Sequence, residues 1–227
     1  MRFIDKMNGN NFNLVVSCPV NDYDFVKAAW ENGADAVKVH LNVNHHASGT
    51  GFKTLKEEYD FVERILSESP VPVGVVVGGS AVDVANDFSN VLEENFDFLS
   101  LYGHHATTQV LEQNKITKMI ACDYSYTSSD IQALEKLGVE ILEVSIMHQD
   151  DYGTPLTIKD LARYKHINNL VNIPTLMPTQ KKIETSDLKS IRDVGFNGIM
   201  IGAVVTTKDF DTYVETIRSF RKAIDSL

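Results

Sequence analysis

Short apolar runs alternate along the chain with longer amphipathic segments, and the alternation repeats eight times. Parallel strands joined by crossover helices produce this pattern, because each strand is buried on both faces while each helix buries only one side. The predicted strands are residues 13–18, 35–42, 71–79, 96–103, 116–123, 139–147, 172–178 and 198–205.

The segments between these strands carry helix start and stop signals. Residues 21–33 begin with Asn and Asp residues that can cap a helix and end at a Gly, and Thr54 with Glu57 has the spacing of a capping box. Several helix-to-strand connections share one pattern, a terminating Gly or Asn followed by an apolar residue and then the strand. They are GADAV (33–37), GVEIL (138–142), GFNGI (195–199) and the variant NFDFL (95–99). This recurrence indicates one structural unit that is repeated along the chain.

Eight such units in 227 residues fit a closed (β/α)8 barrel, an α/β fold, better than an open sheet. The Gly-rich fingerprint GxGxxG of open nucleotide-binding sheets does not follow the first strand. No linker, low-complexity tract or change in charge divides the chain. We therefore expect residues 1–227 to form a single barrel domain.

Composition argues against several classes of function but does not alter the predicted fold. Apolar residues make up 43% and charged residues 23% of the chain, as in ordinary globular proteins, and the formal net charge of −10 opposes binding to nucleic acid or to anionic membranes. The first residues lack an apolar signal segment, and no stretch approaches the about 18 apolar residues that span a bilayer, so a cytoplasmic location is expected. Cys18 and Cys122 form no CxxC pair and are expected to be reduced, buried thiols. A homodimer remains an open alternative.

Polar and apolar residues alternate along the second predicted strand. The apolar set is Val37, Val39 and Leu41, and the polar set is Lys38, His40 and Asn42. A period of two sends the apolar set under the helices and the polar set into the barrel. Buried polar groups cost free energy unless a ligand or a network uses them. One interpretation is structural, with Lys38 paired internally to a residue such as Glu143. We favour the other interpretation, in which these polar side chains bind or transform a ligand.

Further polar residues lie where predicted strands end, which is where (β/α)8 barrels place their active sites. Asp123 ends the fifth strand and Glu143 lies within the sixth, so Lys38, His40, Asp123 and Glu143 are the candidate catalytic residues. The histidines His104, His105 and His148 follow nearby strand ends. A metal site formed by these histidines is the alternative, but they have no short ligand spacing such as HExxH, and neutral imidazole also suits proton transfer. We therefore expect no metal and no cofactor.

The ends of the seventh and eighth strands predict a phosphate site. The candidate ligands are Thr179 and Lys181 in PTQKK, and Gly202 and Ala203 in IGAVV, whose backbone N–H groups can approach an anion. Barrels often bind phosphate at this position. We therefore expect a small phosphorylated substrate. The alternative is that Lys181 and Lys182 lie in a solvated loop and that Gly202 is needed only for the packing of its strand.

The segment NHHASGTGF (44–52) follows the second strand and is a candidate lid over the substrate. Gly49 and Gly51 flank Thr50, which would allow the loop to move over a bound substrate. The lid hypothesis thus names His45, Ser48, Gly49 and Thr50. An ordinary turn is the alternative.

Three segments, NLVVSCPV, KMIACDYSYTSSDIQALEKLGVEILEVS and IMIGAVVTTKDF, resemble the ribulose-phosphate-binding barrels and, within them, the N-acetylmannosamine-6-phosphate 2-epimerases. The resemblance implies a (β/α)8 barrel of the ribulose-phosphate-binding type. It also implies an active-site Asp at Asp123 and a phosphosugar ligand whose phosphate lies near Lys181 and Gly202.

The sequence departs from this family at three positions. Pro19 stands where the family has Gln, VVVGGS lacks the Lys that ends the third strand, and MPTQKK lacks the Glu of the seventh. The catalytic pair of the family therefore cannot be carried over. The function expected is a sugar-phosphate epimerase or isomerase that transfers a proton next to a carbonyl, using Lys38, His40 and either Asp123 or Glu143. The alternatives are a class I (Schiff-base) aldolase and a non-catalytic phosphometabolite-binding barrel.

Overall fold

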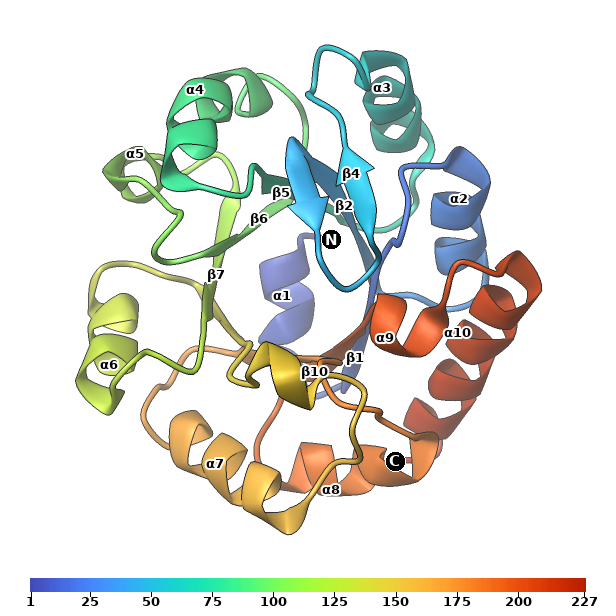
Figure 1. The fold of residues 1–227 in the computed structure, drawn as a ribbon, viewed down its shortest axis with the longest axis vertical. Coiled ribbons are helices and arrows are strands. Elements are labelled where there is room, and N and C mark those ends of the chain that lie inside the picture. The colour runs from blue at the N-terminus through green and yellow to red at the C-terminus, as the bar shows by residue number, and fades with distance from the viewer.

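Eight parallel strands close into a barrel in the computed structural model, which describes residues 1–227 (Figure 1). The barrel strands are β1 (Asn13–Ser17), β2 (Ala36–Leu41), β5 (Val73–Val77), β6 (Phe98–Tyr102), β7 (Thr117–Cys122), β8 (Ile141–Val144), β9 (Thr175–Pro178) and β10 (Gly198–Ile201). Around the barrel their order is β1, β10, β9, β8, β7, β6, β5, β2. The predicted α/β barrel is confirmed, and each predicted strand forms within its predicted range.

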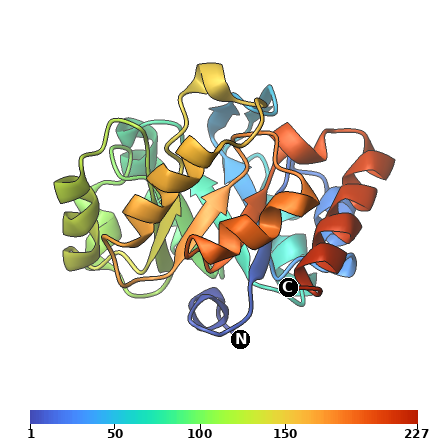
Figure 2. The same ribbon diagram turned by 90° about the horizontal axis from the view of Figure 1, so that it is seen from below.

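Helices surround the barrel and cover its apolar outer face (Figure 2). They are α2 (Tyr23–Glu31), α3 (Tyr59–Glu68), α4 (Ala81–Val91), α5 (Thr108–Glu112), α6 (Ser128–Lys136), α7 (Ile158–Asn168), α8 (Leu188–Asp193) and α10 (Phe210–Ile224), with short 3-10 turns at Gln149–Asp151 and Thr185–Asp187. None of the helices combines the length and the apolar character that crossing a bilayer requires.

The local signals explain where two of these helices begin. Asp22 caps α2 by accepting hydrogen bonds from the backbone N–H groups of Asp24 and Phe25. Glu57 accepts hydrogen bonds from the Thr54 backbone N–H at 3.1 Å and from the Thr54 hydroxyl at 2.7 Å, which is one half of the predicted capping box; the Thr54 hydroxyl itself accepts from no backbone N–H. The residues after Thr54 therefore form a turn, and α3 begins only at Tyr59.

A short helix that the sequence pattern did not predict, α1 (Phe3–Met7), closes the amino-terminal end of the barrel. Phe3 and Met7 are fully buried against the inward side chains of the lower barrel. These side chains are Val15, Ala36, Phe98, Met119, Ile141, Leu176 and Met200. Gly74 leaves room for the Phe98 ring, since a Cβ there would come within 2.1 Å of it. Packing thus fills this end, and only the other end is open to a ligand.

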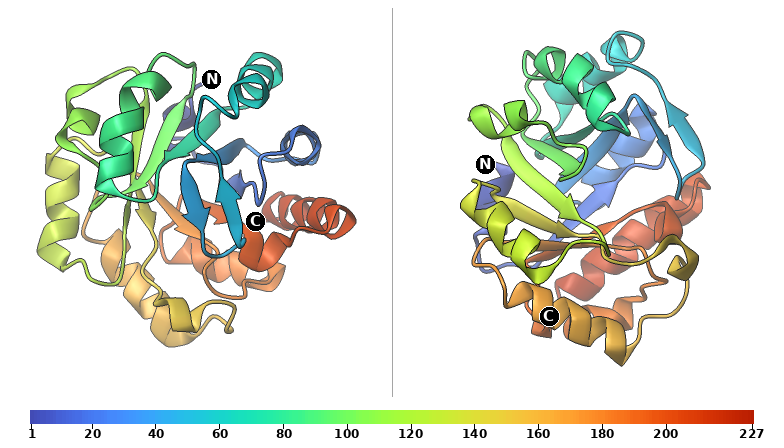
Figure 3. Two further views of the ribbon diagram at one scale, coloured as in Figure 1. Left: turned by 45° about the horizontal axis from the view of Figure 1, so that its top comes forward. Right: turned by 60° about the vertical axis from the view of Figure 1, so that its left-hand side comes forward.

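Two elements modify the open, carboxyl-terminal end. Strands β3 (Val43–His45) and β4 (Thr50–Phe52) form an antiparallel hairpin over the barrel mouth (Figure 3). Helix α9 (Ala203–Thr206) replaces the end of the predicted eighth strand, which stops at Ile201. That prediction was wrong because a short apolar run does not distinguish strand from helix by its periodicity. Ala203 therefore lies in the first turn of a helix.

Candidate functional site

A pocket of about 630 Å³ lies at the carboxyl ends of the barrel strands. Its walls are the inward side chains of the upper barrel, and the β3–β4 hairpin covers part of its mouth. As the alternation predicts, Lys38, His40 and Asn42 line the pocket, while Val37, Val39 and Leu41 pack in the core outside the barrel.

An ion pair between Lys38 and Glu143 forms the floor of this pocket. The two residues come from β2 and β8, which face each other across the barrel with three strands between them on either side. Lys38 Nζ lies 3.8 Å from Glu143 Oε2, and both residues are only 6% exposed. The structure therefore shows the internal pairing that the structural interpretation of Lys38 required, and it places that pair at the base of the cavity.

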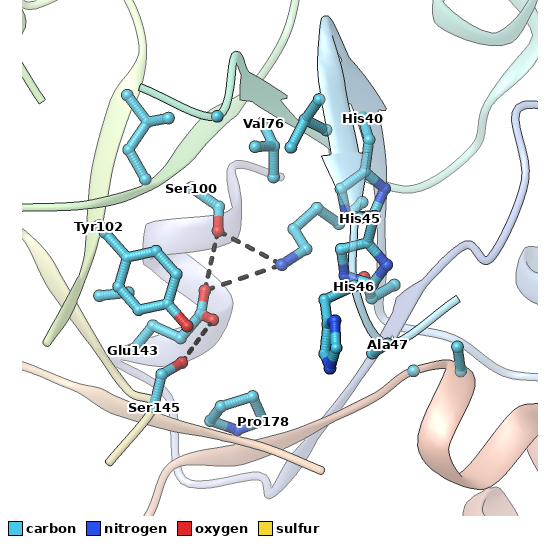
Figure 4. A pocket seen from close by; sticks show the side chains of 18 of the residues that line it. His40, His45, His46, Ala47, Val76, Ser100, Tyr102, Glu143, Ser145 and Pro178 are labelled. Carbon is cyan, nitrogen blue, oxygen red and sulfur yellow. Dashed lines mark hydrogen bonds and ion pairs between the residues drawn. The ribbon is translucent and has the colours of Figure 1, made fainter. Parts of the chain in front are cut away.

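Two serine hydroxyls complete the floor (Figure 4). Ser100, from β6, donates to Glu143 Oε2 at 2.8 Å and accepts a hydrogen bond from Lys38 Nζ at 3.4 Å. Ser145, just after β8, donates to Glu143 Oε1 at 3.0 Å. Burial lowers the pKa of Lys38, and the opposing charge of Glu143 offsets only part of this effect. The amine is thus easier to deprotonate than an exposed lysine.

His40 lies above the floor on the same strand as Lys38. It is 1% exposed, and its ring stacks on Phe52 of the hairpin at a centroid distance of 4.7 Å. Burial lowers its pKa well below the usual value, with His45 and Lys38 adding to the shift, so the ring is neutral at pH 7. Its buried Nδ1 has no hydrogen-bond partner. A buried ring nitrogen without a partner is unusual in a folded protein.

The hairpin over the mouth is held by specific contacts. The Thr50 hydroxyl donates to the Pro19 carbonyl at 2.9 Å, and the Ser48 backbone N–H donates to His45 Nδ1 at 3.3 Å. Burial lowers the pKa of His45 to about 4, so the ring is neutral at pH 7. Because Nδ1 accepts the hydrogen bond from Ser48, the ring proton lies on Nε2. His46 meets Tyr152 from the loop after β8, with ring centroids 6.5 Å apart. Of the four predicted lid residues, only His45 lines the pocket.

The predicted phosphate residues divide into two groups. Thr179, Gly202 and Ala203 line the pocket, and the Gly202 N–H donates to Thr179 Oγ1 at 3.1 Å. Lys181 does not line it. Its buried Nζ lies 3.4 Å from Asp160 of α7 and donates to Thr154 Oγ1 at 2.8 Å, which ties the loop after β9 to α7 and to the loop that precedes it.

Asp123 is likewise separate from the floor. Its carboxylate accepts hydrogen bonds from the backbone and the hydroxyl of Ser125, and it does not line the pocket. Among the histidines at strand ends, His105 lines the pocket while His104 and His148 do not. No three His, Cys, Asp or Glu side chains are grouped so that they could hold a metal ion. The structure thus brings together Lys38, His40 and Glu143, without Asp123.

Sequence reasoning missed several residues that line the site: Ser17, Ser100, Tyr102 and Tyr152. The alternation along β6 contains the signal for Ser100 and Tyr102, because Phe98, Ser100 and Tyr102 share one face of that strand. Tyr152 follows a 3-10 turn in a loop, where no periodic pattern indicates a direction.

Solved structures with the same fold cover nearly the whole chain. Thiamine phosphate pyrophosphorylase from Pyrococcus furiosus has a TM-score of 0.66 at 15% identity over 98% of both chains. Tryptophan synthase from Mycobacterium tuberculosis has a TM-score of 0.70 at 11% identity, over 97% of this chain and 96% of that chain. A mutant tryptophan synthase alpha-subunit from Pyrococcus furiosus has a TM-score of 0.69 at 13% identity, over 95% and 96%.

At these identities the likeness establishes the fold alone, which is the (β/α)8 barrel. No protein-family model matches the sequence, and no curated protein is significantly similar to it. The chemistry of the pocket must therefore be argued from its own residues.

Proposed function

We propose that the protein is an enzyme that moves a proton next to the carbonyl group of a small sugar phosphate, as an epimerase or isomerase does. The observation that carries the proposal is the buried Lys38–Glu143 pair at the base of an open pocket. An ammonium group and a carboxylate at one buried point supply an electrophile and a base, the two groups that enolisation requires.

In this proposal Lys38 polarises the carbonyl oxygen of the substrate. Glu143 or His40 accepts the proton from the neighbouring carbon, and the electron pair of the broken C–H bond becomes part of an enolate whose charge lies on oxygen. The group that accepted the proton then returns it to carbon, or the other of the two protonates the opposite face of the enolate. His40 suits this role because its ring lines the pocket and is neutral at pH 7. A positioned acid or base contributes about 10²–10⁴-fold to the rate.

The substrate phosphate is proposed to bind between the ends of β9 and β10. Thr179, Ala203 and Val204 line the pocket, and the N–H groups of Ala203 and Val204 lie in the first turn of α9, where no carbonyl of the helix accepts from them. Barrel enzymes often bind phosphate at this position. Thiamine phosphate pyrophosphorylase, one of the structurally similar proteins, is named for a phosphorylated compound. Lys181 has no part in this site, because Asp160 and Thr154 hold its ammonium group.

A class I aldolase is the second candidate, and the lowered pKa of Lys38 favours it. An amine that loses its proton more easily is a better nucleophile toward a carbonyl carbon. Lys38 would form a Schiff base with loss of water, and Glu143 would assist the proton transfers.

Isotope exchange and chemical trapping separate these candidates. The protein is incubated in heavy water with dihydroxyacetone phosphate, ribulose 5-phosphate and related keto-sugar phosphates. Deuterium gained next to the carbonyl, without trapping by borohydride, is expected for the epimerase or isomerase. A borohydride-dependent adduct on the Lys38 peptide, absent in Lys38→Met, would identify the aldolase. If members of the panel raise the melting temperature but give neither signal, the protein is a binder and the enzyme proposal is wrong.

A further inference from the structure

Two tyrosine hydroxyl groups line the pocket above the floor. Tyr102 is the last residue of β6, and Tyr152 lies in the loop after β8. Figure 4 shows the Tyr102 ring beside Glu143 and Ser145, on the side of the cavity opposite the hairpin histidines. The two hydroxyls lie close enough for each tyrosine to influence the pKa of the other. Neither residue has a role in the chemistry described above.

Gln180 determines that the Tyr152 hydroxyl acts toward the pocket as a hydrogen-bond donor. Its Oε1 accepts a hydrogen bond from the Met147 backbone N–H at 3.1 Å, which fixes the orientation of the amide. Its Nε2 then donates to the Ser145 carbonyl at 3.2 Å and to the Tyr152 hydroxyl oxygen at 2.7 Å. Because that oxygen already accepts a hydrogen bond, Tyr152 has its own proton left to donate, and no protein group accepts it.

The Tyr102 hydroxyl lies near the hydroxyls of Tyr152 and Ser145 and interacts weakly with both, but no hydrogen bond of normal length holds its proton, which can therefore turn toward a ligand. Burial is the main cause that raises the pKa of both tyrosines, and the nearby Glu143 carboxylate adds to it. Both hydroxyls therefore remain protonated across the neutral pH range. Two O–H donors thus lie beside a cavity whose floor contains a carboxylate.

We infer that Tyr102 and Tyr152 form a two-donor site for the ligand oxygen on which negative charge develops, and that Gln180 is a positioning residue that aims the Tyr152 donor. The inference rests on the proposed function and specifies its substrate class, an α-hydroxycarbonyl compound. Loss of a carbon-bound proton from such a compound leaves an enediolate with two oxygens. Lys38 interacts with one oxygen and the tyrosines with the other. The tyrosines keep their protons, and the base returns its proton to carbon.

The first test measures deuterium exchange into dihydroxyacetone phosphate and ribulose 5-phosphate by variants that lack one hydroxyl. Removal of one preorganised donor costs about 10²–10³-fold in turnover. Tyr102→Phe and Tyr152→Phe are expected to slow exchange at saturating probe by this factor, with a much smaller change in the dissociation constant. Tyr126→Phe is the matched control, because Tyr126 does not line the pocket and its hydroxyl contacts His104. Unchanged exchange in both pocket variants would overturn the inference.

Gln180→Glu tests the positioning role. The variant keeps an oxygen that can accept from Met147, but when ionised it can only accept from Tyr152 and would turn that hydroxyl away from the ligand. Exchange is expected to fall to the level of Tyr152→Phe at pH 8. The ratio of variant to wild-type rate should rise as the pH falls and the new carboxyl gains a proton that it can donate. A ratio independent of pH would mean that Gln180 has only a structural role.

Binding of phosphoglycolohydroxamate, a stable enediolate analogue, tests the donor site independently of turnover. We expect the wild type to bind it more tightly than inorganic phosphate, and each pocket Tyr→Phe variant to lose at least about 10-fold, a loss equivalent to 1.4 kcal/mol. Tyr126→Phe should bind it normally. If the wild type binds the analogue but exchanges neither probe, the proposed reaction is wrong and the donor site stands. If the analogue binds no better than inorganic phosphate, or Tyr→Phe changes nothing, the donor site is wrong.

Discussion

At the scale of single residues, the position of Lys38 determines the character of the site. Its inward direction follows from the period of the strand, and its burial requires a partner, because an unpaired ammonium group in a barrel interior is strongly unfavourable. Glu143 supplies that partner from the opposite strand, and two serine hydroxyls occupy both carboxylate oxygens. Structural pairing and a catalytic role are therefore compatible in this arrangement.

The coupling between Lys38 and Glu143 predicts non-additive effects on stability. Lys38→Met leaves a buried carboxylate without its cation, and Glu143→Leu leaves a buried ammonium group without its anion. Removal of one member of a buried pair costs about 3–5 kcal/mol, whereas replacement of both by apolar residues is often neutral. Each single variant is expected to lose this much free energy of unfolding in urea titrations, and the double variant to recover most of it. Losses that simply add would show that the two groups are not coupled.

At the scale of elements, the β3–β4 hairpin joins the pocket to solvent. The His45 and Phe52 rings of the hairpin pack on His40 and cover the lower part of the pocket. Both histidines are neutral there, with His40 buried and His45 half-buried. The sequence indicated a loop at this position, with two glycines that suggested mobility. The structure shows paired strands whose Gly49 has a positive φ of 60° at the turn. Lid motion remains a prediction for this hairpin.

The hairpin is expected to open as the pH falls. Burial, Lys38, His46 and Lys208 lower the pKa of His45 from 6.5 to about 4. Between these values an opened hairpin binds more protons than the closed one, so acid destabilises the closed form, by at most about 1.4 kcal/mol per pH unit for one histidine. Hydrogen exchange in residues 43–52, corrected for intrinsic rates, should therefore accelerate from pH 7 to pH 5. His45→Phe keeps an aromatic ring without a titrating group and should reduce this acceleration. If hydrogen exchange accelerates equally in His45→Phe and in the wild type, groups other than His45 cause the opening.

At the scale of the whole molecule, the two ends of the barrel have separate roles. The amino-terminal end is filled by α1 and the lower barrel layer, and the carboxyl-terminal end holds the pocket. Backbone and side-chain contacts hold α1 in place, since the Phe3 N–H donates to Asp97 and Arg2 donates to Thr117, both at 2.8 Å. In (β/α)8 barrels the first end maintains stability and the second performs chemistry.

This separation predicts a variant that changes stability alone. Phe3→Ala removes a fully buried ring from the plug and should lower the free energy of unfolding by about 3–5 kcal/mol. The affinity of the folded protein for phosphate ligands should stay within a factor of about two, because the substitution lies at the far end of the barrel. Leu137→Ala, at a 58% exposed position, is the control and should change neither quantity by a comparable amount. A parallel loss of ligand affinity in Phe3→Ala would show that the two ends are coupled.

The barrel and the inward direction of Lys38 and His40 can be predicted from the sequence alone. Both follow from local periodicity: eight alternations of strand and helix, and a period of two within β2. The period also explains why Glu143 faces the same interior.

Which polar residues meet in the pocket depends on the three-dimensional arrangement of the strands and loops. Asp123 and Lys181 have the residue types and strand-end positions of site residues, yet Ser125 and Asp160 engage them outside the pocket. Tyr152 and Gln180 enter the site from loops without periodicity. Side-chain partners across a barrel depend on strand register and loop paths, which are set by long-range packing and leave no trace in the local pattern.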